Sequence, residues 1–251
     1  MRIFTQNCYG PPLIAPYRKE RFWAIAEAIR EEDDDFICLQ EVILPQDLHI
    51  FEIPGYHMSY VPRWGRQSGG LVTLSKEKPS GSWFRQYTRQ GGLKQWSDRL
   101  LGKGLLHTAF KEVIIINTHL LATYGMYEVS RANLEHQLEE FLGHVLNEAY
   151  VGKPIVAAGD FNFGPQSELY AKLSQSMHDL TEALNLPKLG LLAPYPQKLD
   201  YIKGSKHISK KHQEYRHYTA LVHISYGYQE IPVSDHPGVA AEFDIIKDDQ
   251  G

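Results

Sequence analysis

The chain has 251 residues, of which 43% are hydrophobic, and 26 Lys and Arg residues against 30 Asp and Glu residues give a formal net charge of -4. This length allows one large core, and the charge argues against a protein that coats nucleic acid through bulk positive charge, without excluding a local basic patch. No linker rich in Pro, Gly or Ser divides the sequence, so we predict one domain over residues 1–251.

Apolar runs and helical periodicity alternate along most of the chain. In chain order, the sequence first predicts a strand, an amphipathic helix and a second strand at 2–6, 17–32 and 36–42. Three further strands and a long amphipathic helix follow at 69–75, 105–110, 112–120 and about 126–150. The last strands, more closely spaced, are expected at 154–161, 198–204, 218–227 and 238–246. This order favours a mixed α/β sandwich in which helices cover packed sheets.

The cysteines and the lengths of the apolar runs limit where in the cell the protein is expected. Cys8 and Cys38 lie in apolar strands, which predicts buried free thiols rather than a disulfide or a metal site. The N-terminal segment has too few apolar residues for a signal peptide, and no run reaches the roughly 18 apolar residues of a membrane span. We expect a cytoplasmic protein, or one exported without a conventional signal peptide, with no transmembrane segment. The oligomeric state is left open.

Polar side chains stand at the ends of six predicted strands. An ionisable group at the end of a buried strand costs desolvation free energy unless a partner or a metal compensates it. Because neighbouring strand ends can bring such groups together, we predict that they form one site. The residues concerned are Asn7, Glu41, His119, Asp160, Asn162, Asp200, Asp235 and His236.

Each of these residues taken alone also fits a structural role. Asn7 could form a turn, and Glu41 could be a solvated strand-end charge. His119 could be a hydrogen-bonded core histidine, and Asp160 with Asn162 could form an Asx turn before a helix near 165. Asp235 and His236 could be a local hydrogen-bonded pair. Six independent coincidences would then be needed, so the joint pattern favours a functional site.

The residue types fit hydrolysis of a phosphodiester. A phosphodiester anion repels nucleophiles, so its cleavage needs positive charge on the phosphoryl oxygens and a water held in line. Oxygen ligands such as Glu41 and the Asn7 carbonyl suit Mg²⁺, which can polarise the phosphoryl group. His236 beside a carboxylate, either Asp200 or Asp235, can take a proton near neutral pH.

The other polar groups of the set are hydrogen-bond donors. Asn162 and a protonated His119 can donate to the pentacoordinate phosphorus, whose oxygens carry more charge than those of the ground state.

The ordered motifs Gln-Asn, LQEV, NTHL, GDFN, LDYI and SDH together resemble the endonuclease/exonuclease/phosphatase superfamily, from Asn7 to His236. The resemblance implies a four-layer α/β sandwich of two packed mixed β-sheets flanked by helices. It further implies a Mg²⁺ ion, with Mn²⁺ or Co²⁺ as substitutes, held by Glu41 with Asn7 and Asp235 as further ligands. Water would attack phosphorus in line.

The same resemblance implies the roles of the remaining residues. His119 and Asn162 would contact the phosphate, and His236 would be the base, supported by Asp200. Asp160 would position or activate the water, or join a second metal site.

Three segments are similar to the neutral sphingomyelinase branch. DRLLGKGLLHTAF contains Asp98 and Lys103, NTHL is followed by Arg131 and Gln137 on the long helix, and SGGLVTLSKEKP resembles a strand and turn of that branch. We therefore expect Asp98 and Lys103 to bind substrate together with His119. A surface turn with a solvated lysine is the structural alternative for the first segment.

The sequence thus predicts a Mg²⁺-dependent phosphodiesterase, sphingomyelinase- or phospholipase C-like, acting on a lipid headgroup with transient membrane-surface contact. The alternative is a DNA or RNA phosphodiesterase with the same centre. A non-catalytic phosphate-binding module ranks lower because every central group is present. The basic segment 203–217 could bind anionic lipid or nucleic acid, but its composition favours a solvated surface loop.

Overall fold

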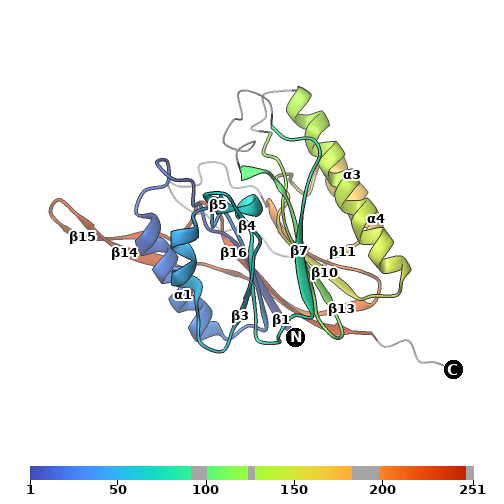
Figure 1. Cartoon of the computed structure of the whole chain (residues 1–251), viewed down its shortest axis with the longest axis horizontal. Helices are drawn as coiled ribbons and strands as arrows, with labels where there is room; N and C mark the ends of the chain where they lie inside the picture. The colour runs from blue at the N-terminus through green and yellow to red at the C-terminus, as the bar shows by residue number, and fades with distance from the viewer. Residues whose placement is uncertain (92–100, 124–127, 183–197, 247–251) are drawn as a thin grey trace.

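The computed structural model describes residues 1–91, 101–123, 128–182 and 198–246. Within these ranges two mixed six-stranded sheets pack face to face, with helices on their outer sides (Figure 1). This arrangement confirms the predicted four-layer α/β sandwich. No helix in the described ranges is both long and apolar enough to cross a membrane.

Each sheet is built around a parallel pair of strands. The first sheet has the order β13 (Ile208–Arg216), β16 (Gly238–Ile245), β1 (Arg2–Asn7), β2 (Phe36–Gln40), β6 (Val72–Ser75) and β3 (His57–Ser59). The second has the order β11 (His178–Asp179), β12 (Asp200–Gly204), β10 (Ile155–Asp160), β9 (Ile114–His119), β8 (Gly104–Ala109) and β7 (Gly81–Gln86). The parallel pairs are β1 with β2 and β9 with β10.

Helices connect the parallel strands and cover the outer faces. Between β1 and β2 runs α1 (Arg18–Glu32), and between β9 and β10 runs α3 (Glu128–Tyr150), which packs beside α4 (Glu168–Ser176). The remaining described elements are two 3-10 helices and two hairpins: Pro45–Phe51, Ser68–Gly70, β4 (Pro62–Arg63) with β5 (Arg66–Gln67), and β14 (Thr219–Ile224) with β15 (Gly227–Pro232).

Alternation along the central strands divides the apolar residues among three cores. In β1, Ile3 points into the core between the sheets, whereas Phe4 points to the core under α1. In β10, Val156 points between the sheets and Ala157 points to the core under α3. Because both faces of these strands are buried, apolar residues occupy successive positions in each rather than alternating with polar ones, as expected for parallel strands covered by helices.

The register brings the polar strand ends to one edge of the molecule. Asn7 stands opposite Gln40 in the parallel pair of the first sheet, and His119 stands opposite Asp160 in that of the second. Asp200 begins β12, which runs antiparallel to β10, and it also pairs with Asp160. Parallel strands therefore end, and their antiparallel neighbours begin, at the same edge.

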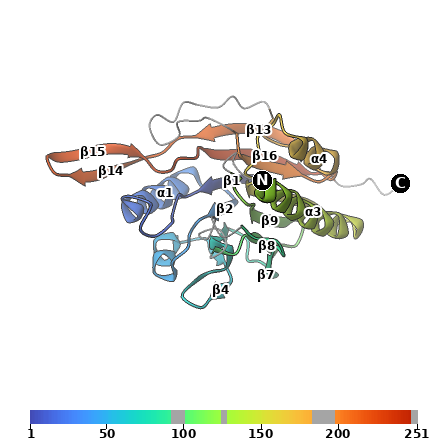
Figure 2. The same cartoon turned by 90° about the horizontal axis from the view of Figure 1, so that it is seen from above.

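One local expectation was wrong. The segment 203–217 was expected to be a surface loop, but most of it forms β13, which pairs with β16 along the edge of the first sheet. The strand expected at 218–227 is present as β14, which forms one arm of the β14–β15 hairpin; this hairpin projects past α1 in two perpendicular views (Figures 1 and 2). Both cysteines are buried and free, as predicted.

Candidate active site

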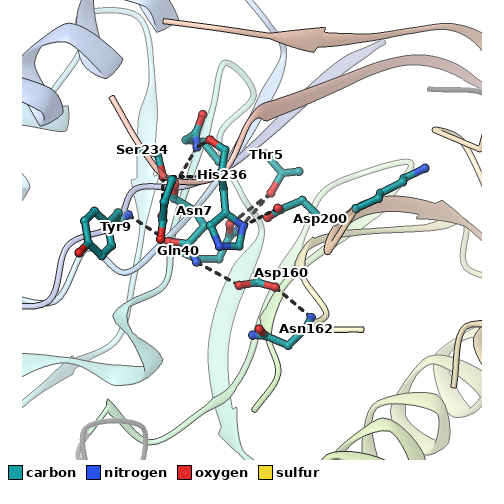
Figure 3. A network of polar contacts seen from close by, with 12 residues as sticks. Thr5, Asn7, Tyr9, Gln40, Asp160, Asn162, Asp200, Ser234 and His236 are labelled. Atoms are coloured by element: carbon teal, nitrogen blue, oxygen red, sulfur yellow. Dashed lines mark hydrogen bonds and ion pairs between the residues drawn. The ribbon is translucent and has the colours of Figure 1, made fainter. Parts of the chain in front are cut away.

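Asp160 lies at the centre of the polar cluster (Figure 3). Its Oδ2 accepts a hydrogen bond of 3.0 Å from the Asn7 side-chain amide and lies 3.3 Å from Nε2 of His119. Its Oδ1 accepts a hydrogen bond of 2.9 Å from the backbone N–H of Asn162. One carboxylate therefore joins the ends of β1, β9 and β10, which belong to both sheets.

The charge of Asp160 is stabilised by its surroundings. Burial alone would raise the pKa of this carboxyl, but the positive charges of His236, His119 and Lys103 and the hydrogen bond to His119 lower it below its ordinary value. Asp160 is consequently an acceptor of hydrogen bonds rather than a proton donor.

Asp200 and His236 form a closely held pair. Nδ1 of His236 lies 2.7 Å from Oδ2 of Asp200, and this bond leaves Nε2 as the ring nitrogen for proton transfer (Figure 3). Burial raises the pKa of Asp200 above its ordinary value, although the charge of His236 opposes the shift. Burial would lower the pKa of His236, but the carboxylates of Asp200, Asp160 and Asp235 raise it well above its ordinary value.

Lys103 extends the positive side of the cluster. Lys103 and His119 are both buried, and Nζ of Lys103 contacts Nε2 of His119. Lys103 precedes β8, which runs antiparallel to β9. The start of β8 therefore lies beside the end of β9, at the edge where the other predicted residues lie. Its predicted companion Asp98 lies outside the described residues.

Glu41 follows β2 in a left-handed backbone conformation, with φ of 63°. This conformation is rare for a residue other than Gly and is found most often at functional sites. The Glu41 carboxylate accepts a hydrogen bond of 3.1 Å from the backbone N–H of Gly10. Any Cβ at Gly10 would lie 2.0 Å from the Glu41 carbonyl oxygen, so a glycine is needed for this approach.

Asp235 stands next to His236 and within electrostatic reach of Glu41. Burial raises the pKa of Asp235, His236 opposes this shift, and the Glu41 charge adds to it. The Asp235 carboxylate accepts a hydrogen bond of 3.3 Å from Ser234 Oγ.

The chemistry of the donors fits a divalent cation. One ligand atom from each of Asp160, Asp200 and His236 lies within 4.8 Å of the others, and Asp200 Oδ1 is buried without a hydrogen-bond partner among the described residues. Glu41 and Asp235 are outside this group of three. They form a second pair of acidic groups whose mutual repulsion a cation would relieve. Carboxylate oxygens in both places suit Mg²⁺.

Sequence reasoning missed the buried amides beneath the site. Gln40 Nε2 donates a hydrogen bond of 2.8 Å to Asn117 Oδ1, and the Asn117 amide donates to the carbonyls of Leu39 and Val72. Asn162, which was predicted, is half-buried, has φ of 56° and donates from its side chain to the Leu120 carbonyl. A polar residue inside an otherwise apolar strand was the available signal for the first two.

Arg21 was also missed, because nothing in its helical position distinguishes it from a surface arginine. It is buried, and its guanidinium donates to the backbone carbonyls of Cys8, Tyr9 and Val233, besides Pro16. Arg21 therefore holds the loop after β1 against the segment that leads to Asp235 and His236.

Comparison with known proteins gives consistent matches. The profile described as the Endonuclease/Exonuclease/phosphatase family matches residues 4–236. The inositol phosphosphingolipids phospholipase C of Schizosaccharomyces pombe is 27% identical over 80% of this chain and 48% of its own length. Human sphingomyelin phosphodiesterase 2 is 27% identical over 66% of this chain and 42% of its own length. This chain thus spans about half the length of the curated relatives it matches or less.

A solved structure of beta toxin from Staphylococcus aureus, a double mutant with bound magnesium ions, has the same fold. It aligns with a TM-score of 0.76 over 96% of this chain and 98% of its own, at 16% sequence identity.

Proposed function

This chain belongs to the Endonuclease/Exonuclease/phosphatase family, and we propose that it is a Mg²⁺-dependent phosphodiesterase that cleaves a lipid headgroup by attack of water at phosphorus. The observation that carries the proposal is the bond of 2.7 Å between His236 and Asp200 beside the buried carboxylate of Asp160. A histidine held through Nδ1 by a carboxylate presents Nε2 to a water molecule, which is the arrangement that proton abstraction requires.

The proton of the attacking water passes to Nε2 of His236 in this proposal. Asp200 keeps the ring in the required tautomer and stabilises the imidazolium that forms. Asp160, held ionised by its positive neighbours, orients the water from the other side. One ligand atom from each of these three groups lies within 4.8 Å of the others.

Positive charge for the phosphoryl oxygens comes from the opposite part of the cluster. Lys103 and His119 lie in contact. The side-chain amide of Asn162 stands in the turn that follows β10. Buried donors that are already in place need little reorganisation when charge develops on the phosphoryl oxygens, so they stabilise the transition state more than the substrate.

Glu41, with Asn7 and Asp235, would hold the divalent cation. When bound, Mg²⁺, or Mn²⁺ or Co²⁺ in its place, polarises the phosphoryl group and stabilises the leaving oxygen. The chain supports this assignment through the strained backbone of Glu41 and the acidic pair that it forms with Asp235. Both features cost free energy that a bound cation offsets.

A lipid substrate is favoured over a nucleic acid. Two relatives carry names that refer to sphingolipid substrates. The cations of β13, which the sequence offered as a site for anionic lipid or nucleic acid, are partly neutralised, because Lys211 pairs with Asp244 and Arg216 pairs with buried Asp34. The β14–β15 hairpin projects from the body of the molecule with Leu221, Tyr226 and Tyr228 largely exposed, which suits contact with a membrane surface.

The test is a substrate panel assayed with Mg²⁺ and again with excess EDTA. It contains sphingomyelin and inositol phosphosphingolipid in mixed micelles, together with duplex DNA, abasic DNA and single-stranded RNA. We expect release of the phosphorylated headgroup from lipid only, and none with EDTA. Glu41→Gln should weaken the apparent affinity for Mg²⁺ by about tenfold or more, and His236→Ala should lower kcat by about 10² to 10⁴.

Matched controls are the exposed residues Glu31 and His57, whose Glu31→Gln and His57→Ala variants should keep wild-type rates. If nucleic acid is cleaved and the lipids are not, the lipid substrate is rejected but the proposed catalytic centre is retained. No turnover of any phosphodiester with Mg²⁺, Mn²⁺ or Co²⁺ would reject the enzyme itself.

A further inference from the structure

A second group of metal-ligating side chains lies away from the candidate active site. His107 is on β8, and His144 and Glu148 are one turn apart on α3. One ligand atom from each lies within 4.8 Å of the others. His107 pairs with Ile116 in the middle of β9, whereas His119 ends that strand, so the group is separated from the catalytic edge.

The two imidazoles of this group are buried, and most of their ring nitrogens lack hydrogen bonds within the described part of the chain. His107 and His144 are 6% and 5% exposed. Both ring nitrogens of His107, and Nε2 of His144, have no hydrogen-bond partner among the described residues. A buried polar atom without a partner costs free energy and is rare in folded proteins, so several in one place indicate a missing ligand.

The surroundings keep both rings in the form that binds metal. Burial lowers the pKa of His107 and of His144, in the latter case to about 4, so that both imidazoles are neutral at pH 7. A metal binds the deprotonated nitrogen, and no proton has to be displaced here. Trp83 stacks on His107, with ring centroids 4.8 Å apart, and meets the edge of His144 at 5.2 Å, which limits the motion of both rings.

We propose that His107, His144 and Glu148 bind a divalent transition-metal ion of the Zn²⁺ class. Two imidazoles and one carboxylate are a ligand set that Zn²⁺ uses with a water in the fourth position. Nitrogen ligands select Zn²⁺, Ni²⁺ or Cu²⁺ over Mg²⁺, so this ion differs from the one in the catalytic cluster. Tetrahedral ligands at the usual bond lengths are roughly 3.4 Å apart, so the three ligand atoms, which lie within 4.8 Å of one another, need only a small approach to hold the ion.

Such an ion would join α3 to the sheet beneath it. His107 belongs to the second sheet, and the other two ligands belong to the helix that covers this sheet. Metal binding to the folded state alone stabilises that state by mass action. The expected effect is therefore on thermal stability and not on the chemistry at the catalytic edge.

The first test uses the wild-type protein freed of metal and then held in excess Mg²⁺, so that oxygen-rich sites are saturated. Co²⁺ is the probe. We expect the visible absorption of four-coordinate Co²⁺ and quenching of tryptophan emission, the latter reduced in Trp83→Phe. A Co²⁺ spectrum typical of six oxygen ligands only, with no quenching that depends on Trp83, would overturn the proposal.

The second test compares Zn²⁺ binding by calorimetry, again in excess Mg²⁺. His107→Gln and His144→Gln should each bind Zn²⁺ about tenfold more weakly or worse, and the rise in Tm that Zn²⁺ causes in the wild type should disappear. The exposed His57→Gln variant is the matched control. Equal Zn²⁺ stoichiometry and affinity in all four proteins would contradict the assignment. Turnover with Mg²⁺ alone should be unchanged in these variants, so the result is independent of the proposed activity.

Discussion

Gln40 in β2 and Asn117 in β9 are joined by a hydrogen bond of 2.8 Å that crosses the apolar interface between the two sheets. The Asn117 amide also donates to two backbone carbonyls of the first sheet. Glu41 directly follows Gln40, and His119 follows two residues after Asn117. The contact therefore sets the distance between strand ends that carry candidate catalytic groups from opposite sheets.

Replacing Asn117 by Leu should destabilise the protein by about 2 to 4 kcal/mol. The substitution keeps a side chain of similar size but removes the Asn117 acceptor of the Gln40 bond and the donor to two buried carbonyls. Urea unfolding followed by circular dichroism measures the change. Asn147→Leu is the matched control, because Asn147 is exposed on α3 and should shift the unfolding free energy by about 0.5 kcal/mol or less. Equal effects of both substitutions would show that the inter-sheet bond contributes nothing.

The rate of phosphodiester cleavage should rise with pH through the titration of His236. As the base, this imidazole acts when deprotonated, and Asp200, Asp160 and Asp235 raise its pKa, so the acid limb lies above the ordinary histidine value of about 6.5. Removing one of these charges in Asp200→Asn lowers the His236 pKa. The acid limb should then move to lower pH, while kcat falls by about 10²-fold because the tautomer is no longer held.

The control for this experiment is Asp244→Asn, since Asp244 lies on the surface in a pair with Lys211. Its pH profile should match that of the wild type. An acid limb that stays in place or moves to higher pH in Asp200→Asn would remove His236 from the role of base.

Stability of the metal-free protein should fall as the pH drops from about 6.5 to about 4. Burial, with smaller contributions from His107 and Arg85, lowers the folded-state pKa of His144 to about 4. The unfolded chain therefore binds a proton in this window that the folded chain does not, and stability is lost as pH decreases. The contribution is about 3 kcal/mol at most. Glu148 and Lys153 are the other charges near the pair, acting on His107.

Unfolding free energies measured with EDTA at several pH values check this expectation. His144→Gln should flatten the dependence between pH 6.5 and pH 4, whereas the exposed His57→Gln should not. The same slope in all three proteins would mean that other groups cause the acid sensitivity.

The β14–β15 hairpin should contribute to binding of lipid surfaces. Tyr226 is fully exposed and Tyr228 is 71% exposed. The double substitution Tyr226→Ser and Tyr228→Ser should weaken co-sedimentation with sphingomyelin vesicles by about tenfold, because amphipathic aromatic rings favour the interface between membrane and water. Trp64→Ser, at the turn between β4 and β5, removes an equally exposed aromatic side chain and should have no effect. Unchanged vesicle binding in the double variant would exclude the hairpin as a contact.

The strands whose ends marked the candidate site are those buried on both faces. In β1, β2, β9 and β10 an unbroken apolar run ends at a polar residue, and this boundary marked both the strand and the site. The edge strands gave no such signal. The β7 strand is mostly exposed, and β13 is rich in lysine because charged side chains protect a free sheet edge from pairing with another chain. Its basic composition therefore favoured a loop.

The residues of the candidate site also divide into those that the sequence pattern reveals and those that it does not. Its charged and amide groups at strand ends could be predicted because each interrupts an apolar pattern. Arg21, Gln40 and Asn117 could not be assigned roles, because their importance lies in which distant backbone groups they reach. Such contacts depend on the register between strands, which pattern alone leaves undetermined.

The pairing of β1 with β16 places Arg2 beside Glu242 and sets the order of events during synthesis. Asn7 precedes His236 by most of the described chain, so it is synthesised long before the histidine. Until β16 has been synthesised, one edge of β1 has no antiparallel partner, so the nascent chain must remain protected from aggregation. A growing polypeptide therefore lacks part of the candidate site, which is complete only when the first sheet closes.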